Sequence, residues 1–280
     1  MKLCPMLCAL ALLVFLPSCS SALPNFDPLA TEEETAAEET AVAPVISTVT
    51  LSGRRFSFAG EETAIAVRDD LLTMKEEGVY RLTGDLAEGG VAVDVGAFGV
   101  VRLILDGVSI RSTRRPAIEI VSAAAVIIET AEGSVNLLRS SREAVIRSSS
   151  NLLLTGEGSL SLGGADEAIA AEGRVSVTSG IVHLTASACG IRSEVGVELS
   201  AEGEVAINAA RVGILTRERS DSGGIVIRGG RLVAVCAEAV LCAQRRICLA
   251  GGKGSFDAPR LYQCPSEVLH TGGEFPRDGR

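Results

Sequence analysis

The sequence of 280 residues contains no tryptophan, and aromatic residues make up only 3% of it. A core built on large rings is therefore excluded, and the 47% of hydrophobic residues must pack mainly as small and medium aliphatic side chains. Only two histidines are present, and no CxxC pair occurs, which argues against a structural zinc site. The formal net charge of −9 argues against nucleic acid as a partner.

The chain also lacks a hydrophobic run long enough to form a transmembrane helix, because the run at residues 7–16 is too short to span a bilayer. It follows Lys2 and is followed at once by Pro17-Ser18-Cys19, which is the arrangement of a secretory signal, and Leu16-Pro17-Ser18-Cys19 resembles a bacterial lipobox. We therefore expect residues 1–18 to be a signal peptide of the lipoprotein type and Cys19 to be lipidated. Simple cleavage after a small residue is the alternative.

The next segment, residues 19–44, is acidic and of low complexity. Such a segment buries too little apolar surface to offset its ordering entropy, so it is predicted to be a disordered tether. Together, the two segments predict an exported lipoprotein that is anchored in a membrane of the cell envelope or at the cell surface.

A small residue followed by a β-branched residue recurs along the chain at spacings of 22 to 27 residues. Each period divides into three short strands that are separated by glycine-containing turns. A β-sandwich gives no reason for such a recurrence, and the helix-forming segments of a leucine-rich repeat do not appear. The recurring pairs are Ala117-Ile118, Ala144-Val145, Ala168-Ile169, Gly190-Ile191, Gly213-Ile214 and Ala239-Val240.

Alternation within the strands predicts which side chains fill the interior. Stacked periods would align them in columns, so we predict an all-β protein with a single-stranded parallel β-helix of about six to eight coils. It spans residues 78–254, with an N-terminal β cap at 45–77 and a C-terminal cap and tail at 255–280. The expected columns contain Val175, Val197, Ile225 and Ile247; Val177, Leu199, Ile227 and Leu249; Val182, Val205 and Leu232; and Leu184, Ile207 and Ala234.

Residues 77–138 resemble the opening of the bacterial carbohydrate-binding β-helix family. The matching features are Gly-x-Tyr-x-Leu-x-Gly at 78–84, LxLDGVxI at 103–110 and AEGSxNxL at 131–138. The resemblance implies a secreted, right-handed, pectate-lyase-like β-helix that binds acidic plant polysaccharide and cellulose without cutting them. It also implies calcium in some members.

The family's later coils carry Asp-Gly-Ile at the corner that opens each period, and those aspartates are typical calcium ligands. This chain has Cys189-Gly190-Ile191, Val212-Gly213-Ile214 and Glu238-Ala239-Val240 instead. Asp166 and Glu167 keep acid at a comparable corner, but calcium takes 6–8 oxygen ligands. We therefore expect no metal and no other cofactor, and we expect this acidic pair to form a solvated turn.

Polar residues are expected at outward positions of the third strand in several successive coils. Adjacent strands lie about 4.8 Å apart, so these side chains would form a strip that exchanges hydrogen bonds with sugar hydroxyls. Outward positions of any solvated strand are also ordinarily polar. The strip consists of Ser109, Asn136, Ser161, His183 and Asn208.

Five arginines fall at one turn or strand end in the first two coils. Guanidinium groups bind carboxylates bidentately, so this corner predicts a site for an acidic ligand, flanked by the polar strip. Ordinary pairing with Glu119 and Glu143 would explain the arginines equally well. The five residues are Arg111, Arg114, Arg115, Arg139 and Arg142.

Catalysis is less well supported than binding. Paired carboxylates do not recur at a stacked position, as polygalacturonase-type hydrolysis would require, and a lyase would need a basic residue beside a calcium cluster. We therefore predict a non-catalytic, surface-tethered protein that binds acidic polysaccharide such as polygalacturonate. A structural or adhesive surface β-helix and a cryptic polysaccharide lyase remain the alternatives.

Five cysteines follow Cys19, in a compartment that permits disulfides. Cys248 falls on an outward position, and Cys264 lies in the segment expected to fold back over the last coil. We therefore predict a Cys248–Cys264 disulfide. Closing this loop would stabilise the folded state by about 3 kcal/mol in the chain-entropy model.

Overall fold

The computed structural model describes residues 45–60, 64–142, 144–200, 202–209, 211–218 and 223–277. The expected signal peptide, Cys19 and the expected tether lie outside the described residues. No helix in the described part of the chain is long and apolar enough to cross a bilayer.

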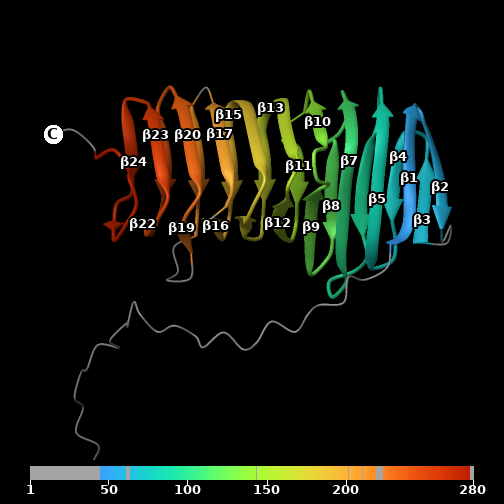
Figure 1. Ribbon diagram of the computed structural model, residues 1–280, viewed down its shortest axis with the longest axis horizontal. Coiled ribbons are helices and arrows are strands. Elements are labelled where there is room, and N and C mark those ends of the chain that lie inside the picture. Colours follow the sequence, from blue (N-terminus) through green and yellow to red (C-terminus); the bar gives the residue numbers. More distant parts are fainter. Residues whose placement is uncertain are drawn as a thin grey trace, which may run out of the picture. The chain divides into compact units, whose positions relative to one another are not determined.

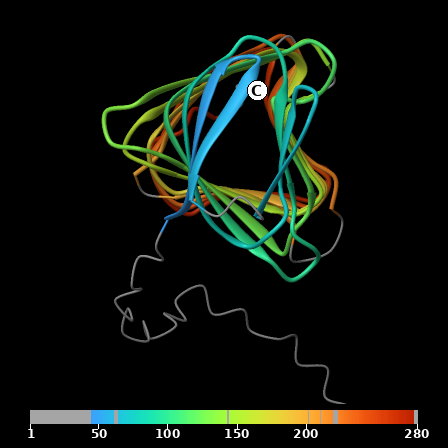
Figure 2. The same ribbon diagram turned by 90° about the vertical axis from the view of Figure 1, so that its right-hand side faces the viewer.

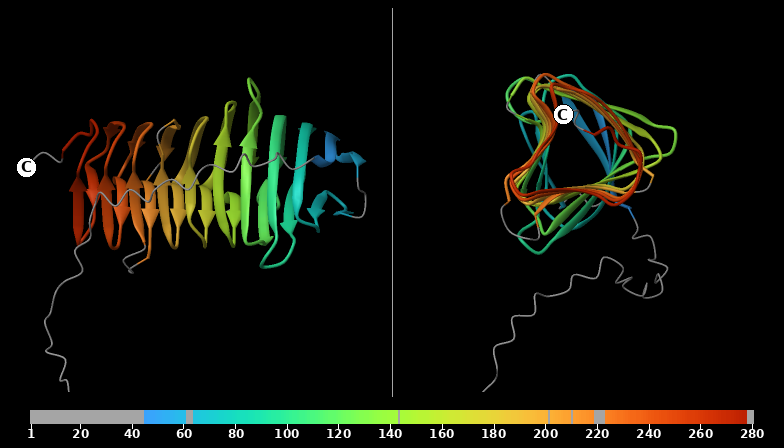
Figure 3. Two further views of the ribbon diagram at one scale, coloured as in Figure 1. Left: turned by 60° about the horizontal axis from the view of Figure 1, so that its bottom comes forward. Right: turned by 90° about the vertical axis from the view of Figure 1, so that its left-hand side faces the viewer.

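The described residues form a right-handed parallel β-helix of about eight turns, as the repeat predicts (Figure 1). Seen along the axis, the strands form three walls around a common interior (Figures 2 and 3). We call these walls faces A, B and C. Every rung after the N-terminal hairpins pairs in parallel with the next, so the backbone groups bond between coils.

Face A begins each coil, and its strands pair in sequence from β1 to β25. The strands are β1 (Val45–Gly53), β5 (Gly78–Leu86), the first half of β7 (Val100–Ser112), β9 (Ala125–Thr130), β12 (Asn151–Gly156), β14 (Val175–Val177), β16 (Gly196–Leu199), β19 (Gly224–Ile227), β22 (Arg246–Leu249) and β25 (Glu267–His270).

Face B follows along the chain, and face C closes each coil. Face B contains the end of β5, whose Asp85 pairs with Ser109, the second half of β7, then β10 (Val135–Ser140), the first halves of β13 (Ser159–Ala171) and β15 (Ile181–Ser193), β17 (Glu204–Ala209), β20 (Arg231–Cys236) and β23 (Lys253–Asp257). Face C contains β4 (Leu71–Met74), β6 (Gly90–Asp94), β8 (Ile118–Ser122), β11 (Ala144–Ser148), the second halves of β13 and β15, β18 (Val212–Thr216), β21 (Ala239–Ala243) and β24 (Arg260–Gln263).

Two antiparallel hairpins stand at the N-terminal end of the helix. Strand β2 (Arg55–Gly60) pairs with β1, and β3 (Ile65–Arg68) pairs with β4. The parallel ladder is longer than the sequence predicts: β1 already pairs in parallel with β5, and β23, β24 and β25 continue beyond residue 254. The C-terminal cap expected at 255–280 therefore contains part of the β-helix itself.

The predicted interior columns are confirmed. Val175, Val197, Ile225 and Ile247 are successive register partners, and all four side chains are buried. The recurring pairs are correct in most coils, but two are displaced by one residue. Ile118 pairs with Ile146 rather than Val145, and Ile214 pairs with Leu241 rather than Val240. These two coils have longer turns, and the spacing of the recurring pairs does not show where in the coil the extra residues lie.

Candidate functional site

Asn136 does not belong to the outward strip, so this expectation was wrong. Its side chain is fully buried, on the same side of β10 as Leu138. Val108 N donates to Asn136 Oδ1 at 2.9 Å, and Asn136 Nδ2 donates to Ser159 O at 3.1 Å and Ser134 Oγ at 2.9 Å. One amide thus joins three successive coils and satisfies buried backbone groups, which is a structural task.

The remaining strip residues lie on face B in two parallel rows. Ser109, Ser161 and His183 share one row, in which Leu137 occupies the place expected for Asn136. Asn208 stands in the neighbouring row, where its register partner in the preceding coil is Thr185.

That second row begins with the arginines. Arg111 pairs in register with Arg139, Arg139 with Gly163, Gly163 with Thr185, and Thr185 with Asn208. We call these five residues the arginine row. The sequence reasoning missed Thr185 and Gly163, although counting along β13 and β15 from the neighbouring row would have found both.

Arg111 and Arg139 are exposed neighbours of like charge. Neither guanidinium forms an ion pair with any carboxylate in the described part of the chain. Like charges placed directly opposite one another on neighbouring strands are destabilising. The two groups are therefore available to an anion from outside the chain, which would relieve their repulsion.

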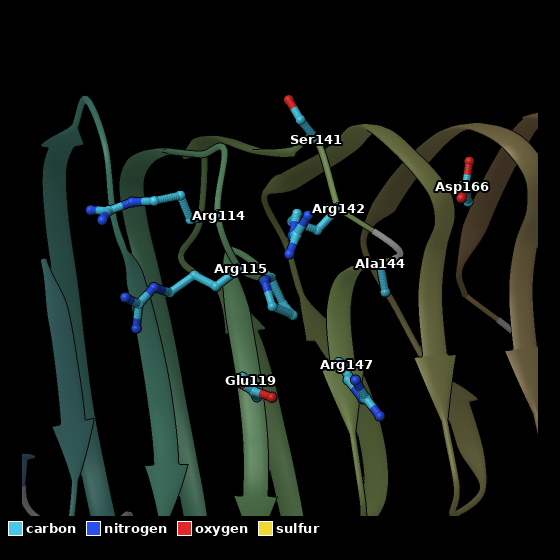
Figure 4. A pocket seen from close by; sticks show the side chains of 9 residues that line it. Arg114, Arg115, Glu119, Ser141, Arg142, Ala144, Arg147 and Asp166 are labelled. Atoms are coloured by element: carbon cyan, nitrogen blue, oxygen red, sulfur yellow. The ribbon is translucent and has the colours of Figure 1, made fainter.

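Arg114 and Arg115 differ, because both are held by the protein itself. Asp70 is buried and accepts from Arg114, and its second oxygen accepts from Arg115 Nη2 at 2.9 Å. Glu88 lies 3.9 Å from Arg114 Nε. In Figure 4 both arginine side chains extend toward the preceding coil. These two arginines reach past the coil of β6 and fasten the β3–β4 turn to the coil of β8, so their predicted part in ligand binding has less support than that of Arg111 and Arg139.

A shallow hollow of about 510 Å³ lies beside them at the corner between faces B and C (Figure 4). Arg142 points into it and makes no ion pair with the described residues, whereas Glu143 lies outside them. Glu119 and Asp166 also line it, so its charge is mixed. The hollow is lined by Arg114, Arg115, Pro116, Glu119, Ser141, Arg142, Ala144, Arg147 and Asp166.

A comparison with known protein families identifies the family of this chain. The family of carbohydrate-binding domain-containing proteins matches residues 68–259, which is more than half of the chain. The chain belongs to this family. The match begins in β3 and ends after β23, so it covers the arginine row and nearly all of the β-helix.

A solved structure shows the same fold as this carbohydrate-binding domain protein. It is described as a polysaccharide lyase-like protein from C. thermocellum, determined as a gadolinium derivative. The TM-score is 0.73 at 22% sequence identity, and the alignment covers 82% of this chain and 100% of that one. The likeness establishes a shared fold. A search among curated proteins found no match.

The acidic corner of this carbohydrate-binding domain protein does not fit calcium. Asp166 Oδ1 accepts from Ser187 Oγ at 2.7 Å, while Glu167 Oε1 accepts from Arg192 Nε at 2.6 Å. The two carboxylates are thus engaged separately. Among the described residues, no group of three or more His, Cys, Asp or Glu side chains is placed to hold a metal ion. The described residues thus offer no suitable ligand set for the calcium that the resemblance implies for some members.

The predicted Cys248–Cys264 disulfide is wrong, because both thiols are free. Cys248 lies on β22 in face A, whereas Cys264 directly follows β24 in face C and packs against the core. The two cysteines therefore belong to different walls of the coil. Burial, reinforced by the charge of Glu167, raises the pKa of Cys189 to about 12, and burial raises the pKa of Cys236 to about 11. Both thiols are core groups rather than nucleophiles.

Proposed function

We propose that this protein is a non-catalytic binding module for acidic polysaccharide and that Arg111 and Arg139 are its anion contacts. The observation that carries the proposal is the placement of these two exposed guanidinium groups on neighbouring rungs, without a described carboxylate to pair with either. Arginine binds carboxylates bidentately, so an acidic sugar can satisfy both groups at once.

The rest of face B supports the binding of a polymer. Its strands run side by side over several coils, so the outward rows form a flat surface that a long chain can follow (Figure 1). Ser161, His183, Thr185 and Asn208 can donate hydrogen bonds to sugar hydroxyls or accept them. The family description also names carbohydrate as the ligand class.

The test is retention on polygalacturonate in affinity electrophoresis. Arg111→Ala with Arg139→Ala should weaken retention by roughly tenfold or more, since each lost charged hydrogen bond is worth about 1.5–3 kcal/mol. The matched control is Arg54→Ala with Arg55→Ala, which removes the same charge from the exposed β1–β2 turn. Equal loss in both double variants would reduce the effect to net charge and refute the site.

Salt provides a second criterion for the same site. Exposed charge contacts weaken as the Debye length falls to about 8 Å at physiological ionic strength and about 3 Å at 1 M. Retention of the wild type should therefore fall steeply with salt, whereas residual retention of the Arg111/Arg139 double variant should depend on salt much less.

We also propose that the protein is exported and anchored by lipid on Cys19, with residues 19–44 as a tether. The support is the apolar run at residues 7–16, whose last residue begins the lipobox-like Leu16-Pro17-Ser18-Cys19. Wild type and Cys19→Ser would be expressed in a bacterial host and compared by detergent partition. Wild type should enter the detergent phase, and Cys19→Ser should stay aqueous; equal aqueous partition would contradict the anchor.

A further inference from the structure

The arginine row changes character after its second residue. Beyond Arg139 its outward positions are Gly163, Thr185 and Asn208, followed by Val235 and Asp257. The cations are thus confined to the first two rungs, and the last rung is acidic. We call the stretch from Gly163 to Asn208, with Ser161 and His183 in the adjacent row, the neutral strip.

A uniform polyuronate would not match this order of charges. Lying along the row, it would place carboxylates over the neutral strip, where no side chain of the row supplies a cation. A carboxylate that loses hydration without a charged partner is costly. Hydroxyl groups of neutral sugars suit the strip better, because Thr185, Asn208, Ser161 and His183 exchange hydrogen bonds with hydroxyls.

The second observation is that the fold does not require glycine at position 163. The register shift in β13 uses Gly164, which has a φ of +94°, so the bulge does not require glycine at 163. A Cβ on Gly163 would meet Thr185 Cβ at 3.7 Å, which is an ordinary contact. Glycine weakens a strand interior and often marks a place where a ligand approaches the backbone closely.

From these two observations we infer that the ligand carries an acidic group next to a run of neutral sugar residues. The acid lies on Arg111 and Arg139, and the neutral sugars follow the helix axis over Gly163, Thr185 and Asn208. This site spans four rung spacings, about 19 Å. The inference rests on the proposed function and specifies its substrate class: a sparsely charged acidic glycan is preferred over a uniform polyuronate.

The test compares two probes of equal length by titration calorimetry: gellan oligosaccharides, in which neutral sugars separate the uronates, and polygalacturonate oligosaccharides. Wild type should bind gellan oligosaccharides about fivefold more tightly. Gly163→Thr adds a β-branched side chain that suits a strand and should lower gellan affinity about fivefold. The same substitution should change polygalacturonate affinity by less than about twofold.

Gly163→Arg provides the opposite test, because it extends the row of cations by one rung. It should raise polygalacturonate affinity and lower gellan affinity. Unchanged melting temperatures of both variants would show that the fold is kept.

Equal affinity of the wild type for both probes, or gellan binding that Gly163→Thr leaves intact, would overturn the inference. In either case, loss of polygalacturonate binding in the Arg111/Arg139 double variant would still support the proposed function. Wild type that binds neither probe would overturn both.

Discussion

Faces B and C are built from parallel strands of the same coils, but their outward rows arrange charge in opposite ways. On face C, Glu119 stands in register with Arg147, and Arg192 forms ion pairs with Glu167 at 2.6 Å and with Glu194 at 2.5 Å. On face B, the register partner of Arg111 is Arg139.

The two faces share one backbone geometry, so the difference lies in the side chains alone. The Glu167 hydrogen bond raises the pKa of Arg192, which shows how far the charges of face C are satisfied within the chain. Arg111 and Arg139 of face B have no such partner among the described residues. Other rows of face B also set opposite charges in register, as at Glu204 and Arg231, so the like charges are particular to Arg111 and Arg139 and mark these two as the groups offered to a ligand.

The largest effect is expected beneath face B, at Asn136. Asn136→Leu would keep the volume but leave the buried Val108 N–H and the partly buried Ser159 C=O without their Asn136 partner, at about 1–3 kcal/mol each. Urea unfolding should therefore show a loss of about 2–5 kcal/mol. Ser161→Leu, an outward polar-to-apolar change on the same face, should leave stability nearly unchanged. Equal stability of Asn136→Leu and wild type would contradict the buried clamp.

The next effect concerns pH, at the buried thiol beside the charges of face C. Unfolding lowers the pKa of Cys189 from about 12 toward the ordinary 9.0, so above pH 9 the unfolded state loses a proton that the folded state keeps. The stability due to this thiol is therefore complete below pH 9 and is lost as pH rises toward 12, by about 2 kcal/mol at about pH 10.5.

Chemical unfolding of wild type and Cys189→Ala across this pH range would measure the effect. The alanine variant should lose less stability between pH 9 and pH 10.5. Parallel pH profiles of the two proteins would show that the thiol does not govern alkaline unfolding.

A smaller effect separates the two faces directly. Arg192→Ala removes two ion pairs and leaves the half-buried Glu167 without its guanidinium, so unfolding should become easier by about 1–2 kcal/mol. Arg139→Ala should change stability by less than about 0.5 kcal/mol. Polygalacturonate binding should respond in the reverse order. If Arg192→Ala weakened binding and Arg139→Ala did not, the assignment of the two faces would be reversed.

The smallest effect is a gain of stability. Arg139→Glu would place a carboxylate opposite Arg111 on the neighbouring rung and replace repulsion by attraction. Thermal unfolding should show a stabilisation of about 0.2–1 kcal/mol, together with loss of polygalacturonate binding. A loss of stability would mean that the like-charged pair is not under repulsion.

Most of the fold could be predicted from the sequence, because alternation is a local property. The inward positions of Val175 and Val177, for example, follow from a period of two and need no tertiary information. Alternation also puts Asn136 on the inward side with Leu138, and it was misplaced only because a polar side chain was expected to face outward; backbone groups of neighbouring coils supply its hydrogen bonds instead. Alternation left open which wall of the coil Cys248 and Cys264 would occupy.

The sequence by itself determined the parallel β-helix, its period, its aliphatic interior and its likeness to carbohydrate-binding β-helices, because short-range patterns carry all four. Only the tertiary structure decided which arginines can meet a ligand. Asp70 lies 44 residues before Arg114 in the chain, yet it neutralises that guanidinium across one coil. Arg111 and Arg139 become neighbours only through the strand register. Charge pairing depends on distance in space, which spacing along a chain does not measure.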